Sequence, residues 1–168
     1  MKRVSPRRGL IVAGCVAGAG ALSSLVPAAA TAGGCDPGVH SYGSAHIRTF
    51  CGPAAVTLHM AGKTVKLTGG ECTRASQYLA VNIGSVLVGA TSKPVPNYFG
   101  LDVGKTPGGG KPAPRDGTYM AFANAFAVGG KSYSSISTTV ALQGGRTRGS
   151  FSGKLIEGGS VSGSFTCS

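Results

Sequence analysis

Acidic side chains are scarce in this sequence, which has only 5 Asp and Glu among 168 residues and no Trp. Catalysis by carboxylates or by a Ser-His-Asp set needs groups whose surroundings tune their reactivity. Most of the acids stand in turn-like sequence contexts instead, namely Asp36, Asp102, Asp116 and Glu157. The G-x-S-x-G pattern of a nucleophile elbow is also missing. We therefore expect a protein that is not an enzyme.

Charged residues of both signs make up only 12% of the chain, so no long acidic or basic tail is expected. Glycine is abundant, with 29 residues, and serine and threonine are frequent. This composition favours short β-strands and tight turns over helices. The length suits one domain with a single hydrophobic core.

The first 32 residues have the pattern of a targeting segment. Four basic residues precede position 9, residues 10–26 are apolar and rich in small side chains, and Ala30-Thr31-Ala32 supplies a small-residue cleavage pattern. We predict a signal peptide over 1–32 and an exported protein, extracellular or on the outer face of the membrane or cell wall. The alternative is a retained transmembrane anchor, which Ser23, Ser24 and Pro27 disfavour because they interrupt the apolar run.

Two cysteines are candidates for lipidation, which requires an aliphatic residue and two small residues before the modified cysteine. Val12-Ala13-Gly14-Cys15 matches that box, but it follows fewer apolar residues than the roughly 7–15 of a typical signal sequence. Cys35 lies closer to the expected cleavage site, but Ala32-Gly33-Gly34 before it is a poor match. We rank ordinary cleavage after Ala32 first, lipidation at Cys15 second and lipidation at Cys35 third.

Cleavage after Ala32 leaves an even number of cysteines, Cys35, Cys51, Cys72 and Cys167. In an oxidising compartment this number indicates disulfides, and four cysteines allow three pairings. We favour Cys35 with Cys51, because these two bracket a short segment. We favour Cys72 with Cys167, because both are expected on strand faces that are directed toward one core.

The segment between the first two cysteines also holds His40 and His46, so a Cys2His2 metal site has to be considered. Structural zinc ligands usually come in pairs at short spacings, whereas these ligands alternate as C-x4-H-x5-H-x4-C. An oxidised loop with solvent-exposed histidines is the preferred interpretation, and no metal is expected. His59, between the core positions Leu58 and Met60, is expected to face solvent on a strand.

The region 62–84 predicts two adjacent antiparallel strands with one buried face. Apolar residues alternate with polar ones on both sides of a polar bend at 73–76. Val65 and Leu67 share one side before the bend, and Leu79, Val81 and Ile83 share one side after it. A period of two is typical of half-buried strands.

Cys72 would face outward by this alternation, unless Gly69-Gly70 forms a β-bulge that shifts the register by one. We predict this bulge. Near the end of the chain, Val161, Gly163, Phe165 and Cys167 share the inward side. With the bulge, both cysteines point into one core.

Several weak motifs in one order give the chain a family resemblance. They are Gly62-Lys63 after the strand 56–60, Thr68-Gly69 with Cys72, Val81-Asn82-Ile83, and the terminal Phe165-Thr166-Cys167-Ser168. In these residues the chain, from about Ala54 to its end, resembles the mycobacterial lipoprotein antigen family, the LpqH-like proteins. The resemblance implies an exported, surface-exposed, mostly β domain with an N-terminal lipid anchor, recognised by host receptors and without enzymatic activity.

Residues 118–128 are the most apolar segment of the exported chain. As a strand, this segment places Met120, Phe122, Asn124, Phe126 and Val128 on one face. As a helix, it would instead pair Phe122 with Phe126. The strand fits the context better, and Asn124 must then find hydrogen-bond partners in the core. Gly129-Gly130 predicts a two-residue hairpin turn into a strand with Ser134, Ile136, Thr138, Val140 and Leu142 on one face.

The segment 146–155 predicts a strand with a basic outer stripe made by Arg146, Arg148 and Lys154. The exported chain keeps 12 of 16 Lys and Arg against all 5 acids, a net charge of +7. Such a stripe could contact an anionic membrane surface or an anionic cell-wall polymer. The alternative is a solvated strand face whose charges prevent sheet association, which fits the lack of interleaved aromatics. Export argues against nucleic acid as a partner.

Two glycine–lysine segments superficially resemble phosphate-binding loops. In the G-x4-G-K pattern, Lys105 and Ala125 occupy the two first-glycine positions, and Pro112 stands where Ser or Thr is required. Both segments are expected to be turns, and no cofactor is expected.

These observations predict an all-β, disulfide-stabilised antiparallel β-sandwich or flattened barrel of about 7–9 short strands, with meander and Greek-key connections. The expected order is a signal peptide over 1–32, a disulfide-closed N-terminal loop over 33–53 and a β domain over 54–168. The expected function is that of a non-enzymatic exported surface protein. The alternatives are a secreted binding protein for a small apolar ligand or an anionic envelope component, and a secreted hydrolase with a dispersed site around His40, His46 or Asn124.

Overall fold

A computed structural model describes residues 34–106 and 109–168, which belong to one compact unit. The predicted signal peptide, the alternative membrane anchor and Cys15 lie outside the described residues. The described residues form ten strands: β1 (Gly38–Tyr42), β2 (Ala45–Phe50), β3 (Ala54–Met60), β4 (Lys63–Arg74), β5 (Tyr78–Val88), β6 (Tyr98–Gly104), β7 (Gly117–Val128), β8 (Lys131–Gln143), β9 (Arg148–Leu155) and β10 (Ser160–Thr166). Within that part of the chain, no helix is long and apolar enough to span a membrane.

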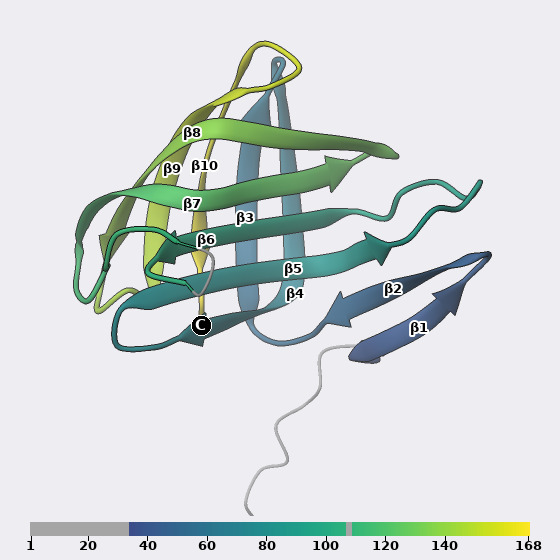
Figure 1. The fold of residues 1–168 in the computed structure, drawn as a ribbon, viewed down its shortest axis with the longest axis horizontal. Helices are drawn as coiled ribbons and strands as arrows, with labels where there is room; N and C mark the ends of the chain where they lie inside the picture. Colours follow the sequence, from purple (N-terminus) through teal and green to yellow (C-terminus); the bar gives the residue numbers. More distant parts are fainter. Residues whose placement is uncertain (1–33, 107–108) are drawn as a thin grey trace, which may run out of the picture. The chain divides into compact units, whose positions relative to one another are not determined.

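Eight of the strands close an antiparallel barrel (Figure 1). From β3 to β10 every strand pairs with the next one along the chain, and β10 closes the barrel by pairing with β3. The predicted all-β fold and the barrel alternative are confirmed. The Greek-key connections are wrong, since the barrel is a continuous meander. The expected 7–9 strands become ten because the N-terminal segment adds two.

That N-terminal segment is a β-hairpin and not the loop expected over 33–53. β1 pairs with β2, and β2 pairs with the second half of β5, from Gly84 to Val88. β4 pairs with β5 only as far as Asn82, on the same edge of β5. β5 is therefore long enough for its first half to complete the barrel and for its second half to carry the hairpin, as Figure 1 shows.

The barrel interior is filled by apolar side chains from alternate strand positions. Leu79, Val81 and Ile83 are fully buried, as the period of two predicts. Phenylalanines from four strands, Phe99, Phe126, Phe151 and Phe165, are at most 4% exposed. The rings of Phe99 and Phe151 lie 5.3 Å apart across the interior. Burial of this apolar surface is the main stabilising term for the fold.

The predicted bulge at Gly69 is confirmed. Ala54 pairs with Gly70 and Ala55 pairs with Thr68, so that Gly69 is skipped in the ladder. Gly69 has φ of 84°, a left-handed conformation that glycine adopts without strain. Beyond the bulge Cys72 is half-buried and packs against the core, as does Cys167.

Two further bulges overturn the face assignments for 118–128 and for the next strand. Asp102 pairs with Ala123 and Val103 with Ala121, so Phe122 is skipped in β7. Similarly, Ile136 is skipped in β8. Phe122 is 47% exposed and Ile136 70% exposed, whereas the sequence placed both with buried residues. The error arises because alternation cannot show where a bulge inverts the two faces.

The first half of β7 therefore has the opposite orientation from the predicted one. Tyr119 and Ala121 pack against the core, and Met120 is 58% exposed. After the bulge, Asn124 and Phe126 are buried as predicted. The strand assignment itself is confirmed, and so is the two-residue turn at Gly129-Gly130, since Val128 pairs with Lys131.

Candidate functional site

The disulfide between Cys72 and Cys167 joins β4 to the end of the chain. The two Cα atoms are 5.5 Å apart, and the residues are 95 positions apart in the sequence. Cys167 follows β10, and its backbone N–H donates to the Thr147 carbonyl at 2.8 Å. The bridge thus fastens the last barrel strand to β4, which lies on the other side of β3.

The second disulfide joins Cys35 to Cys51, with Cα atoms 6.0 Å apart, and closes the β1–β2 hairpin. Both disulfides have the pairing that the sequence analysis favoured. A sulfur in this bond cannot also carry an acyl thioether, so the structure disfavours Cys35 as a lipidation site. Two disulfides in one small domain indicate an oxidising environment.

The histidines of this hairpin do not meet. His40 pairs with Ile47, while His46 pairs with the next residue of β1, Ser41, so the two imidazoles project from opposite faces. His40 instead contacts Asp36, with Nε2 2.9 Å from its carbonyl oxygen and Nδ1 3.7 Å from its carboxylate. Both cysteines are oxidised. In the described ranges, no group of three or more His, Cys, Asp or Glu could hold a metal ion.

The predicted basic stripe is divided by the structure. Arg148 and Lys154 are exposed on the outer face of β9, as expected. Arg146 precedes β9 in a turn, and its Nη1 donates to the carbonyls of Ala75, Tyr78 and Ala113 at 2.8, 3.2 and 3.1 Å. Arg146 therefore stabilises one end of the barrel and does not belong to the stripe.

Asp116 holds the same turn from the other side. Its carboxylate accepts from the backbone N–H of Gly145 at 3.0 Å and of Arg146 at 2.7 Å. These backbone hydrogen bonds lower the pKa of Asp116. Arg146 has φ of 63°, a strained conformation for a residue with a side chain. The two N–H bonds and the three carbonyl bonds offset that strain.

Asn124 starts a directed chain of hydrogen bonds inside the barrel wall. Its Nδ2 donates to Thr138 Oγ1 at 3.1 Å, Thr138 donates to Ser135 Oγ at 2.7 Å, and Ser135 donates to the Lys154 carbonyl at 2.9 Å. Because the last acceptor is a carbonyl, every hydroxyl must donate onward, which fixes the amide orientation. The remaining Asn124 Oδ1 is buried and accepts no hydrogen bond from the described residues.

A polar cluster that the sequence did not predict lies on the outer face of β5 and β6. The Tyr98 hydroxyl donates to Asn82 Oδ1 at 2.7 Å, and the Tyr98 ring lies 6.0 Å from Phe50 of the hairpin. Burial, with a contribution from Asp102, raises the pKa of Tyr98 to about 12, while Arg48 acts in the opposite direction. Burial also raises the pKa of Asp102. The signal in the sequence is the spacing of Tyr98, Gly100 and Asp102, because alternate residues of a strand lie on one face.

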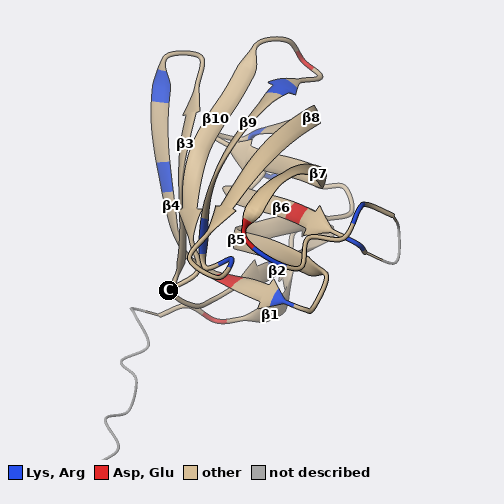
Figure 2. Cartoon of the chain, turned by 90° about the vertical axis from the view of Figure 1, so that its left-hand side faces the viewer, with Lys and Arg blue, Asp and Glu red and all other residues tan. Residues whose placement is uncertain are grey.

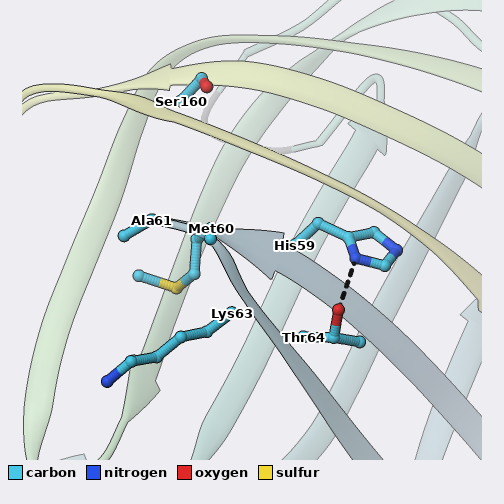
Figure 3. A pocket seen from close by; sticks show the side chains of 7 residues that line it. His59, Met60, Ala61, Lys63, Thr64 and Ser160 are labelled. Atoms are coloured by element: carbon cyan, nitrogen blue, oxygen red, sulfur yellow. Dashed lines mark hydrogen bonds between the residues drawn. The ribbon is translucent and has the colours of Figure 1, made fainter.

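A shallow pocket of about 360 Å³ lies at the tip of the β3–β4 hairpin (Figure 3). His59 is exposed there, as predicted, and its Nδ1 lies 3.0 Å from the hydroxyl of its cross-strand partner Thr64. Figure 3 shows that the side chains of Met60 and Lys63 point away from this pair. The pocket combines one imidazole, one amine and the two hydroxyls of Thr64 and Ser160, and its lining contains no carboxylate.

Two other pockets lie near the second half of β5. One, of about 510 Å³, opens between the first disulfide and the Gly69 bulge, where β2 and β4 separate. The other, of about 210 Å³, lies between the second half of β5 and the β7–β8 hairpin, and the residues that line it include Val86, Leu87 and Phe126. The latter is smaller than the roughly 300–1,000 Å³ of typical small-molecule sites.

No protein-family model and no curated protein matches the sequence. Among solved structures, the chain is similar to a redesigned β-barrel, with 18% sequence identity and a TM-score of 0.41 over 70% of this chain and 90% of that chain.

Proposed function

We propose that this chain is a non-enzymatic exported protein of the cell surface or cell envelope, resembling the mycobacterial lipoprotein antigens. The observation that carries the proposal is the pair of disulfides, which fasten the N-terminal hairpin and the last barrel strand. Such bridges persist in extracytoplasmic compartments and stabilise small secreted domains. The N-terminal leader pattern in the sequence supports the same location.

The contacts and positions of the side chains that could take part in catalysis support a non-enzymatic role. The four cysteines in the described part of the chain are oxidised, Asn124 donates its amide to Thr138, and the two hairpin histidines project from opposite faces. A hydrolase would need His40, His46 or Asn124 to meet an acid at one cleft. The side chain of Asp36, which contacts His40, is 86% exposed, so solvent screens the electrostatic interaction between the carboxylate and the imidazole.

A carrier of a small apolar ligand needs a cavity inside the barrel. The barrel centre is instead occupied by phenylalanine and aliphatic side chains with exposures near zero. A surface role therefore fits better than a carrier role. Its partners are then the membrane surface or an anionic envelope polymer, with host receptors as the further implication of the family resemblance.

Intact mass spectrometry of the protein exported with its own leader tests this proposal. We expect the mass of residues 33–168, reduced by four hydrogen atoms because two disulfides form. A diacylglyceryl adduct on a fragment that begins at Cys15 would instead establish the lipid anchor. Retention of the full-length chain in the cytosol with reduced cysteines would contradict the proposal.

A further inference from the structure

Large exposed apolar side chains are concentrated on one part of the barrel. Among the described residues, six such side chains are strongly exposed, and Val39 and Val88 are the two outside this region. The other four lie on β7, on β8 and just after β9, and we call them the apolar patch: Met120 (58% exposed), Phe122 (47%), Ile136 (70%) and Ile156 (63%).

The strand register makes these four residues neighbours. Met120 pairs with Thr139, whose hydroxyl donates to the Met120 sulfur at 3.6 Å. Phe122 follows two positions later on β7, and Ile136 of β8 lies in the same interruption of the β7–β8 ladder, between the pairs Met120–Thr139 and Ala125–Ser134. The Ile156 N–H donates to the Ser134 carbonyl at 3.0 Å. Adjacent strands are about 4.8 Å apart, so the four residues lie on neighbouring segments of one stretch of the barrel wall.

The patch exists because two bulges face each other across β7 and β8. Simple alternation would bury Phe122 with Asn124, and Ile136 with Thr138. Instead the ladder is interrupted between Met120–Thr139 and Ala125–Ser134, with the same register on both sides. The interruption turns both apolar side chains outward and accompanies the unsatisfied Asn124 Oδ1. Bulges are over-represented next to active sites, and contiguous exposed apolar patches mark interaction sites.

Basic residues border the patch. Lys154 pairs with Ser137, beside Ile136, and is exposed. Gly109 and Gly110 lie against Phe122, so close that a Cβ at Gly109 would be 3.0 Å from the ring, and exposed Lys111 follows them directly. Figure 2 shows where the basic and acidic residues lie along the strands.

Two carboxylates also lie at the margin of the patch. Asp102 pairs with Ala123, and Glu157 follows Ile156. The two lysines and the two carboxylates balance locally, but the exported chain as a whole has a net charge of +7, so the patch belongs to a basic protein. Apolar side chains bordered by lysines on a basic protein suit the headgroup region of an anionic bilayer.

We propose that the apolar patch docks this protein on bilayers that contain anionic phospholipids. Phe122 and Ile136 enter the boundary between headgroups and acyl chains, and Lys111 and Lys154 contact the phosphates. The inference rests on the proposed function, because an exported envelope protein is the one that meets the outer membrane leaflet. It adds the surface and the chemistry of the partner.

The test is co-sedimentation of the disulfide-bonded exported protein with vesicles of phosphatidylcholine, with or without phosphatidylglycerol. We expect binding to the anionic vesicles, weakened by salt. Phe122→Ser with Ile136→Ser should lower the partition coefficient about tenfold or more, since both buried side chains are lost. Val39→Ser with Val88→Ser is the matched control and should leave it unchanged. Lys111→Gln with Lys154→Gln should weaken binding more than Lys63→Gln with Lys66→Gln on β4.

The absence of tryptophan offers a second readout. The single substitution Phe122→Trp should give emission that shifts to shorter wavelength on anionic vesicles and that brominated lipids quench. Val39→Trp should show neither change.

Equal vesicle binding by the Phe122→Ser/Ile136→Ser variant would overturn the inference. So would a change from dimer to monomer in that variant, because the patch would then join two copies of the chain. Both outcomes differ from failure of the proposed function, which the intact mass and location of the exported protein report.

Discussion

The side-chain amide of Asn124 donates to the hydroxyl of Thr138 at 3.1 Å, between the two strands whose ladder is interrupted at this point. This contact spans the opening that the two bulges create. It is also the first step of the hydrogen-bond chain to the Lys154 carbonyl.

Removal of the Thr138 hydroxyl should therefore destabilise the barrel. Thr138→Val leaves the buried Asn124 amide without an acceptor, and we expect a loss of about 1–3 kcal/mol in the free energy of unfolding. Asn124→Leu removes an amide whose Oδ1 is already unsatisfied and should cost less than Thr138→Val. The double variant should recover part of the loss. Denaturant unfolding of all four proteins measures the coupling, with exposed Thr139→Val as a control. Strictly additive effects would show that the contact is not formed.

The two disulfides should differ in their contribution to stability. Loop-entropy estimates give about 3 kcal/mol for a short loop such as that closed by Cys35–Cys51, and about 4–5 kcal/mol for the long loop closed by Cys72–Cys167. We expect Cys72→Ser with Cys167→Ser to lower the midpoint of denaturant unfolding more than Cys35→Ser with Cys51→Ser. The reverse order would mean that the hairpin stabilises the barrel more than the C-terminal bridge does.

Substitutions of Arg146 and Arg148 should distinguish an arginine that stabilises the fold from one that only lies on the surface. Arg146→Gln leaves three backbone carbonyls without their shared donor, so we expect a loss of about 1–3 kcal/mol in stability. Arg148→Gln, on the exposed face of β9, should change stability by less than about 0.5 kcal/mol. Thermal unfolding of both variants makes the comparison. Equal effects would contradict the assignment of Arg146 to the end of the barrel.

Tyr98 should ionise late and make stability depend on pH. Its pKa is raised from 10.0 to about 12 in the folded protein, so the folded state favours the protonated phenol. The stabilisation is fully present below pH 10 and is lost as the pH rises through 12. An absorbance titration should show a phenol that ionises near pH 12 and that is missing in the Tyr98→Phe variant. The variant should also lose less of its stability than the wild type over this interval, and an equal loss in both proteins would refute the assignment.

Asp102 should also make stability depend on pH, and its contribution to stability should likewise be lost as the pH rises. Burial raises its pKa above 3.8, so the folded state favours the neutral carboxyl group. Its contribution is fully present below pH 3.8 and is lost as the pH rises through the raised value. Asp102→Asn should thus raise the melting temperature at neutral pH and change it little below pH 3.8. A stabilisation that is the same at both pH values would point to another cause.

The local sequence pattern was enough to predict the eight barrel strands and the disulfide partners, but not the β1–β2 hairpin, which was expected to be a loop. The alternation of apolar and polar residues from Val65 to Ile83 and from Val161 to Cys167 predicted the buried faces. The glycine pair at 69–70 predicted the bulge that turns Cys72 inward. The reason is that side-chain direction in a strand follows directly from sequence parity, and a glycine marks a break in that parity.

The bulges at Phe122 and Ile136 carry no such mark, because neither residue is a glycine. Their position depends on how β7 fits between β6 and β8 in a closed barrel, which is a property of three strands together. The same holds for Arg146, whose carbonyl partners come from segments 33–71 residues away in the chain. The sequence by itself determined which residues can form the barrel strands and the disulfides. Only barrel closure decided which apolar side chains lie outside, because closure fixes the register of each strand against two neighbours at once.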